Sequence, residues 1–318
     1  MKKILIATTA LVATAGMAAA DMKLSGYGRF GLDYTNGAAV GTSKTQVNMR
    51  MRVNIDGSKE TDSGVTFGGR IRMQYTDGDV GATLNAAMLY ATYAGMRMEV
   101  GNANTAYDSV ALMYNSEIGY LDRGFGDPAG TFYSYASTPY GAAEANRMGI
   151  FASYSFGDGN VRLSYVDPNQ TLSGVAAPKE EIGISADYKF GQFTVAAAAV
   201  ADGGGIRGND QYFLGAEYAI TPDANVGLLY FDNGDVNGAV AGDLGRRVTL
   251  YGNYKMGAIT YKGYIANDNN VANSAVGMTK TSYGVGLDYD LGGARLAADI
   301  HRSYAKKTVA GLGVRFNF

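Results

Sequence analysis

Polar and apolar residues alternate along most of the chain. In residues 46–56, every odd position is apolar and every even position is polar or charged. Successive side chains of a β-strand point to opposite faces, so this alternation predicts a strand with one apolar and one polar face. Such a strand is about long enough to cross a bilayer when tilted, whereas strands of soluble sandwiches usually have about five or six residues. The same alternation recurs in residues 65–75, 182–190, 212–220, 248–254 and 283–291.

The links between these segments alternate in length. Short links rich in Gly, Asp or Asn, such as residues 157–160 and 292–293, are typical of hairpin turns, and longer polar links lie between them. Short turns on one side and long loops on the other are characteristic of outer-membrane barrels. We therefore predict an all-β fold, a 16-stranded antiparallel transmembrane β-barrel forming a single domain over residues 21–318. Its strands are expected to begin near Lys23, Gln46, Val65, Asn85, Met96, Arg147, Val161, Glu180, Phe193, Gln211, Asn225, Arg246, Ala258, Thr281, Ala294 and Thr308.

Tyrosines and phenylalanines gather at the ends of the expected strands. Aromatic rings favour the boundary between membrane and water, and barrels carry them as two girdles. Aromatic residues also favour strands in general, but their position at strand ends on the apolar face favours the girdle. Examples are Tyr34, Tyr75, Tyr154, Phe156, Tyr188, Phe190, Phe193, Tyr218 and Phe316.

Residues 102–146 interrupt the alternation. The segment is rich in aromatic and aliphatic residues, so it is expected to pack against other parts of the protein. Loops of this length in compact domains usually have a function, and a barrel of sixteen strands has room inside for one. We predict that this loop folds inward and narrows a pore. An external lid or interaction loop is the alternative.

The two ends of the chain indicate export. Lys2 and Lys3 precede a short apolar core over residues 4–16, and three alanines at positions 18–20 form a small-residue cleavage site. This arrangement predicts a signal peptide over residues 1–20 that is cleaved. The core is too short for a membrane-spanning helix, which needs about 20 apolar residues. The chain ends in an alternating strand whose last residue is Phe318.

Composition excludes several classes of protein. The chain has no cysteine, so no disulfide can stabilise it after export. Without Lys2 and Lys3, 25 basic residues stand against 29 acidic ones, a formal charge of −4. That balance provides no basic surface for a nucleic acid. The abundance of glycine (45) and tyrosine (24) beside only 5 prolines fits long antiparallel strands.

Two patterns could suggest an enzyme. Residues 26–31 match G-x-G-x-x-G, but a dinucleotide site needs that motif between a strand and a helix, and here it lies within an expected strand. Asp299, His301 and Ser303 share one face of a late strand and have the residue types of a hydrolase triad. Residues i and i+2 of a strand are about 6.6 Å apart, too far for a nucleophile and its base. His301 is the only histidine, so we expect no histidine-based metal site, no cofactor and no enzymatic activity.

Four segments resemble the general porins of alphaproteobacteria, namely residues 21–26 (DMKLSG), 61–68 (TDSGVTFG), 283–293 (YGVGLDYDLGG) and 311–318 (GLGVRFNF). The resemblance covers the whole mature chain and depends on the order and spacing of these segments. It implies a homotrimeric, 16-stranded diffusion channel whose third extracellular loop forms the constriction. It also implies that Phe318 is part of the signal read by the barrel-assembly machinery.

Charged residues of the expected pore fall into two groups. Five arginines lie near mid-strand on the polar faces of the first three strands, and four acids lie in the long loop, where Arg123 is the only cation near them. Facing groups of opposite charge would create a transverse field across the pore. Ordinary solvated lumen charge is the alternative interpretation. The basic wall comprises Arg29, Arg50, Arg52, Arg70 and Arg72, and the acidic loop comprises Asp108, Glu117, Asp122 and Asp127.

We therefore expect a passive outer-membrane channel for ions and small hydrophilic solutes, with a weak preference for cations. A solute-specific channel is the alternative within the same class, because Phe151, Phe213 and Phe231 fall on the inward face. A barrel hydrolase is a more distant alternative. Expected partners are outer-membrane lipid, the barrel-assembly machinery, and two further copies of the chain. Small residues near the junction of the two ends, Gly26, Gly28, Ala310 and Leu312, are expected to let neighbouring barrels approach closely.

Overall fold

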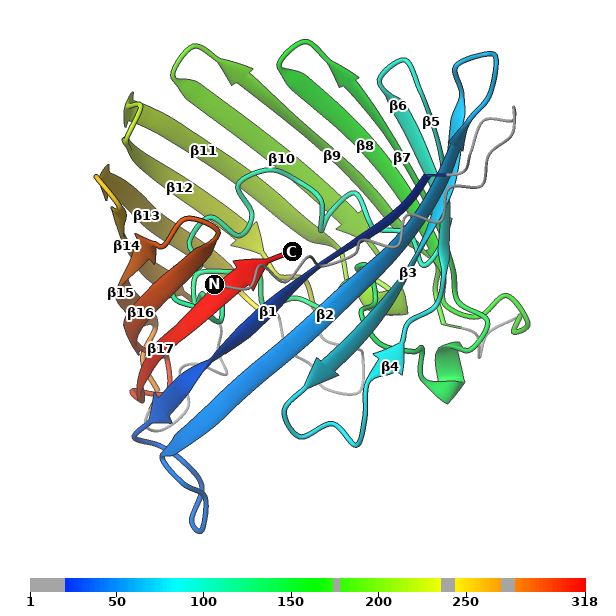
Figure 1. Cartoon of the computed structure of the whole chain (residues 1–318). Coiled ribbons are helices and arrows are strands. Elements are labelled where there is room, and N and C mark those ends of the chain that lie inside the picture. Colours follow the sequence, from blue (N-terminus) through cyan, green and yellow to red (C-terminus); the bar gives the residue numbers. More distant parts are fainter. Residues whose placement is uncertain (1–20, 174–177, 236–243, 270–277) are drawn as a thin grey trace, which may run out of the picture.

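The alternating segments form strands that pair antiparallel with their neighbours in sequence (Figure 1). The computed structural model describes residues 21–173, 178–235, 244–269 and 278–318, so the predicted signal peptide lies outside the described residues. The strands are β1 (Asp21–Thr35), β2 (Thr45–Glu60), β3 (Thr66–Thr76), β4 (Thr83–Leu84), β5 (Met88–Tyr93), β6 (Met96–Gly101), β7 (Met148–Phe156), β8 (Gly159–Asp167), β9 (Glu181–Phe190), β10 (Phe193–Ala201), β11 (Gln211–Thr221), β12 (Ala224–Asp232), β13 (Arg246–Met256), β14 (Ile259–Asp268), β15 (Thr281–Asp290), β16 (Ala294–Arg302) and β17 (Thr308–Asn317). Two short 3₁₀ turns, η1 (Ala142–Glu144) and η2 (Gly203–Gly205), lie in loops.

The sheet closes on itself, because β17 pairs with β1 from Thr35↔Val309 to Tyr27↔Asn317. β4 and β5 both pair with β3 and form two pieces of one wall strand, so the barrel has sixteen strands, as predicted. The break between the two pieces coincides with Asn85, whose side-chain Oδ1 accepts the backbone N–H of Arg72 at 2.7 Å. A side chain thus takes part in the pairing where the predicted single strand is divided.

The two faces of each strand have opposite character. On β9, the outward side chains of Ile182, Ile184 and Tyr188 are exposed, whereas the inward side chains of Glu181 and Ser185 are buried. An apolar exterior around a polar interior suits a barrel surrounded by lipid. Among the described residues, no helix has the length and apolar character needed to cross a membrane.

Aromatic rings form two contacting groups at the short-turn ends of β7 to β11. Phe156 stacks near Tyr188 with ring centroids 6.4 Å apart, and Phe190 stacks on Phe193 at 5.6 Å. Phe193 in turn contacts Tyr218 at 4.7 Å. These rings lie on the outer face, where the aromatic girdle of a membrane barrel is expected.

The junction between β1 and β17 is covered by the two C-terminal phenylalanine rings. The ring of Phe318 occupies the space that a Cβ would need at Gly26, and the ring of Phe316 does the same at Gly28. The backbone of Phe318 also exchanges hydrogen bonds with Gly26, at 2.8 and 3.1 Å. The expectation that these two glycines lie bare for a neighbouring barrel is therefore wrong, because rings of the same chain cover them.

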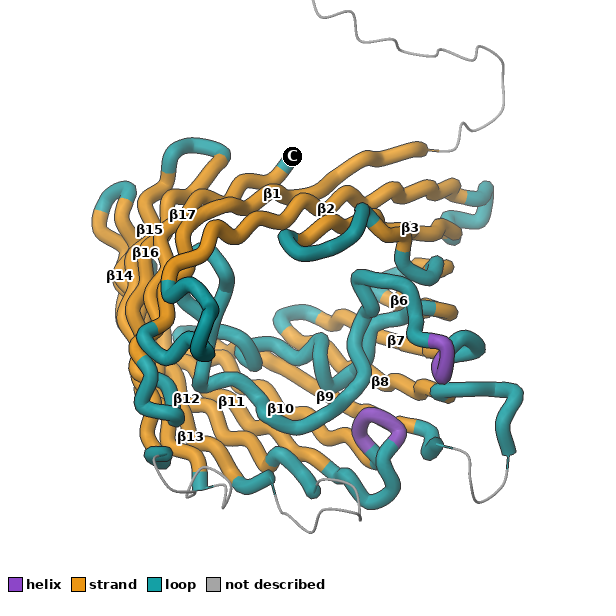
Figure 2. The backbone as a smooth tube through the Cα atoms, turned by 90° about the horizontal axis from the view of Figure 1, so that it is seen from below, coloured by secondary structure: helices purple, strands orange, loops and turns teal. Residues whose placement is uncertain are grey.

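The apolar core lies inside the barrel, between the wall and the long loop of residues 102–147, named L3 here. L3 crosses the interior in Figure 1, and in Figure 2 loop segments lie inside the ring of strands. Its Tyr107, Leu112 and Met113 belong to one buried cluster with inward side chains of β10 to β14, including Phe213 and Phe231. The prediction that the loop folds inward is confirmed by this packing.

Candidate functional site in the barrel interior

Strand register brings the basic residues of the wall together. Arg29 on β1 lies directly opposite Arg50 on β2, and Tyr27 lies opposite Arg52. Across the junction, Arg29 also lies opposite Arg315 on β17, which lies opposite Arg295 on β16. Four arginines therefore form a row across four neighbouring strands. Arg295 and Arg315 are not among the arginines predicted from the sequence, because only the closing register places them beside β1.

Most of the predicted basic wall contacts neutral groups. Arg29 donates to the backbone oxygen of Leu121 in L3 at 3.1 Å. Arg50 donates to Thr76 Oγ1 at 3.1 Å and to the Tyr27 hydroxyl at 3.3 Å. Such contacts orient a guanidinium group and leave its charge uncompensated.

Arg70 differs from the other four residues of the predicted wall. Its Nε lies 2.7 Å from Asp56 Oδ1 on the neighbouring strand β2. Among the described residues, none of the other four forms an ion pair. The charge of the wall therefore resides in Arg29, Arg50, Arg52 and Arg72.

Asp122 is the predicted acid of L3 whose carboxylate contacts arginines of the barrel, on β16 and β17. Its two carboxylate oxygens form ion pairs with Arg295 and Arg315. The adjacent Arg123 pairs with Asp33 on β1, with Nη2 and Oδ1 2.8 Å apart. L3 is thus held by charge to both sides of the junction between β17 and β1.

The other three predicted acids are half-buried in L3, and the pKa of each is raised. Burial raises the pKa of Glu117 to about 8, with a further contribution from Asp127, against the opposing effect of Arg315. Burial likewise raises the pKa of Asp127 to about 7, although a hydrogen bond from Ser116 opposes the shift. Burial also raises the pKa of Asp108, which accepts a 2.7 Å hydrogen bond from the Tyr114 hydroxyl. These acids do not form a uniform row of charges facing the arginines.

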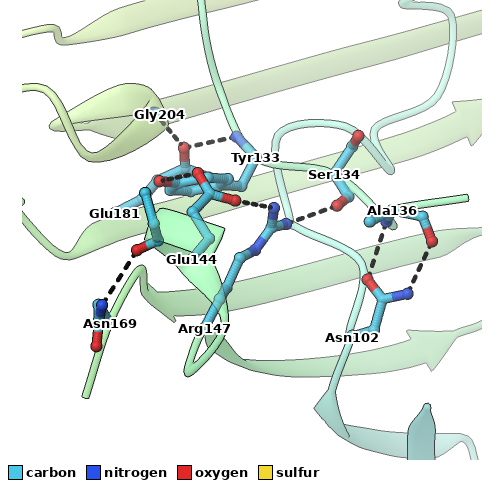
Figure 3. A network of polar contacts seen from close by, with 10 residues as sticks. Asn102, Tyr133, Ser134, Ala136, Glu144, Arg147, Asn169, Glu181 and Gly204 are labelled. Carbon is cyan, nitrogen blue, oxygen red and sulfur yellow. Dashed lines mark hydrogen bonds and ion pairs between the residues drawn. The ribbon is translucent and has the colours of Figure 1, made fainter. Parts of the chain in front are cut away.

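A polar network holds the last part of L3, residues 133–147, here called its returning arm (Figure 3). Glu181 Oε2 on β9 accepts the backbone N–H groups of Tyr133 at 2.8 Å and of Gly204 at 2.7 Å. The side-chain amide of Asn102 binds both backbone groups of Ala136, at 2.9 and 2.8 Å. Arg147 donates to the backbone oxygen of Ser134 at 2.8 Å. The segment from Tyr133 to Ala136 is therefore held by Glu181 of the wall and by Asn102 and Arg147 at the two ends of L3.

The inward phenylalanines support L3 and do not form an open track. Phe213 and Phe231 stack with centroids 5.0 Å apart and are 1% and 0% exposed. Phe151 is also buried, at 5% exposure. A solute-specific path along aromatic residues needs rings that are exposed to the lumen. These three rings are buried, so they do not support such a path.

Asp299 and His301 form a buried support beneath L3. His301 Nε2 lies 2.8 Å from Asp299 Oδ2, and Nδ1 lies 2.9 Å from the Tyr264 hydroxyl, so both ring nitrogens have partners. The Tyr264 hydroxyl also accepts the backbone N–H of Phe125 in L3 at 3.3 Å. Ser303 Oγ accepts the N–H of Lys307 at 3.2 Å, and among the described residues it forms no hydrogen bond with His301. This arrangement positions L3 and lacks the geometry of a nucleophile and its base.

The chain is similar to known proteins over nearly its whole length. A family model described as Gram-negative porin matches residues 7–308. A porin of Fuscovulum blasticum is 43% identical over 303 residues, which cover 94% of this chain and 100% of that protein. A porin of Rhodobacter capsulatus is 29% identical over 334 residues, with the same coverage of each chain. A solved structure of a mutant Rh. blastica porin matches with a TM-score of 0.87 at 42% identity, covering 94% of this chain and 100% of that one.

Proposed function

The chain belongs to the Gram-negative porin family, and from that premise we propose that L3 and the arginines of β1 to β3 form the constriction of its channel. A porin forms a water-filled channel in the outer membrane, through which ions and small hydrophilic solutes diffuse passively. In our proposal Arg29, Arg50, Arg52, Arg70 and Arg72 form one side of the constriction. The acids Asp108, Glu117, Asp122 and Asp127 of L3 set the charge of the other side.

The contact between Asp122 and the arginines of β16 and β17 carries this proposal. Because this contact attaches L3 to the wall beside the arginines, it supports the proposal that the loop crosses the lumen there and narrows the water-filled path. Fixed charges beside narrow water act on each passing ion, because they lie within one Debye length of it, about 10 Å at 0.1 M salt. We expect a weak preference for cations, which the unpaired arginines limit.

Several further features belong to the same proposal. Residues 1–20 are a cleaved signal peptide, Phe318 is read by the barrel-assembly machinery, and the channel is a homotrimer. The protein has no enzymatic activity, and the buried positions of Asp299 and His301 support a structural role for both. In planar bilayers, the trimer is expected to give conductance in groups of three equal steps.

Reversal potentials under a salt gradient test the constriction. Replacing Arg50, Arg52 and Arg72 together by Gln removes three positive charges and is expected to increase cation preference several-fold. The matched control replaces the exposed rim residues Lys44, Lys306 and Lys307 by Gln, removing the same charge outside the lumen. An equal shift in both variants would show that the arginine wall is not at the narrowest point.

A further inference from the structure

Two guanidinium groups meet at one hydroxyl oxygen inside the barrel. Arg52 Nη2 lies 3.1 Å from Ser137 Oγ, and Arg72 Nη1 lies 2.7 Å from the same atom. The arginines come from the neighbouring strands β2 and β3, and the serine comes from the returning arm of L3. Two cationic donors therefore converge on a position occupied by a neutral acceptor.

Both arginines are held in place without being neutralised. Arg52 Nε donates to Gln74 Oε1 and Arg72 Nε donates to Asn54 Oδ1, each at 2.8 Å. Within the described parts of the chain, neither guanidinium has a carboxylate partner, whereas Arg70 is paired with Asp56. Amide acceptors at Nε fix the plane of each guanidinium and leave Nη groups directed toward the shared oxygen.

Aromatic rings restrict the two arginines further. The guanidinium carbon of Arg52 lies 4.9 Å from the centroid of the Tyr27 ring, and that of Arg72 lies 4.5 Å from the centroid of the Tyr135 ring. Both are cation–π distances. The two groups therefore have defined positions before any ligand arrives.

The serine is also fixed in position. Asn85 Nδ2 donates to the Tyr135 hydroxyl at 2.9 Å and to the Ala136 backbone oxygen at 2.8 Å. Asn102 binds the backbone of Ala136 on both sides (Figure 3). The residue before Ser137 is thus held by Asn85 from the barrel wall and by Asn102 at the start of L3, so the three groups form a rigid set.

We propose that Arg52, Arg72 and Ser137 form a binding site for a phosphate-bearing anion, either inorganic phosphate or a phosphate monoester. Planar guanidinium groups bind phosphate through paired hydrogen bonds. A phosphate group offers at least three oxygens, so the two guanidinium groups and the serine hydroxyl can each bind a different oxygen, whereas a carboxylate offers only two. The hydroxyl of Ser137 can donate its hydrogen to the third oxygen.

This site deepens the proposed function and rests on it, since the anion reaches the arginines only through the water of the channel. A weakly binding site within a narrow path concentrates its ligand there and lets it leave again, as conduction requires. The channel would then admit phosphate-bearing solutes more readily than its net negative charge suggests. Phosphate would also compete with chloride, so its effect on current would saturate.

Inorganic phosphate added to single channels recorded in KCl tests the proposal. In the unmodified protein, we expect the single-channel current to fall as the phosphate concentration rises and then to reach a plateau. In the double variant Arg52→Gln/Arg72→Gln, the half-saturating phosphate concentration should rise about tenfold or more, because charge-assisted hydrogen bonds are lost. The control Arg97→Gln/Arg162→Gln removes two charges from guanidinium groups that are paired with Glu99 and Asp187, and should keep the response.

A second variant tests the site without removing an arginine. Ser137→Asp places a carboxylate where the two guanidinium groups meet, so it should occupy the site and abolish the response to phosphate. Equal phosphate sensitivity in Ser137→Asp, the arginine double variant and the unmodified protein would overturn the site. A folded barrel that gives no current steps in KCl would instead overturn the proposed channel, so the two failures are distinguishable.

Discussion

At the scale of single residues, ionisation of Glu117 makes the net charge inside the barrel depend on pH. Burial raises its pKa to about 8, so its carboxyl group is mostly protonated at neutral pH and ionises as pH rises toward 9. Each ionisation adds a negative charge within the electrostatic reach of Arg315 and Arg295. Cation preference is therefore expected to increase between pH 6 and pH 9, measured as reversal potential under a KCl gradient.

The variant Glu117→Gln isolates this effect. It cannot ionise, so it should lose at least about half of the pH-dependent shift; the rest comes from Asp127, whose pKa of about 7 lies in the same range. Glu60→Gln is the matched control, since Glu60 is an exposed residue at the end of β2. If Glu117→Gln keeps the full shift, Glu117 does not face the conducting water.

At the scale of elements, L3 depends on a few attachments to the wall. Glu181 of β9 holds the backbone of Tyr133 in L3 and of Gly204 in η2 at the same carboxylate oxygen. Glu181→Ala leaves both N–H groups without this partner, and an unsatisfied buried donor costs roughly 1–3 kcal/mol. We expect L3 to move more, seen as greater current noise in the open channel, while the unfolding temperature of the barrel changes by only a few degrees.

The small effect on unfolding follows from the location of Glu181. The hydrogen-bonded ladder of sixteen strands is untouched by the substitution, and that ladder dominates the stability of the wall. Asn169→Ala is the control, because Asn169 Nδ2 also donates to a backbone oxygen of L3, that of Ala143 at 3.1 Å, but at an exposed position where water can replace the bond. Quiet open channels in Glu181→Ala would mean that the other attachments of L3 are sufficient.

At the scale of the whole molecule, the barrel is closed where its two ends meet. Phe318 contributes two backbone hydrogen bonds to Gly26 and a ring that covers the outer face there. Deleting Phe318 removes these contacts from the strand that closes the barrel, which is expected to reduce the yield of assembled barrels in the outer membrane several-fold. Conductance of the barrels that do assemble should stay unchanged, because the ring is on the lipid side.

Two control variants distinguish the effect of the Phe318 ring on assembly from the effect of its backbone at the barrel junction. Phe193→Ala removes an exposed aromatic ring of the girdle far from the junction and should leave the yield nearly normal. Phe318→Ala keeps the backbone pairing with Gly26 and removes only the ring. A normal yield after deletion of Phe318 would contradict a role for this residue in assembly.

Period-two alternation was sufficient to predict the barrel and the inward folding of L3. Alternation is a property of neighbouring residues in one strand, so it can be read without knowledge of distant contacts. It correctly assigned Arg29, Arg50, Arg52, Arg70 and Arg72 to the inner face. The loss of alternation after Gly101, together with the apolar residues that follow, was sufficient to identify a loop that packs inside.

Only the tertiary structure decided how the interior charges are paired. Closure of β17 onto β1 brings Arg315 beside Arg29, although the two lie at opposite ends of the chain. Register between β2 and β3 neutralises Arg70 with Asp56 and leaves Arg72 facing Ser137. The path of L3 places Asp122 on two arginines and leaves Asp127 half-buried beside Ser116. A strand pattern fixes the face on which a side chain lies, whereas its partner depends on register and on loop path, which distant residues set.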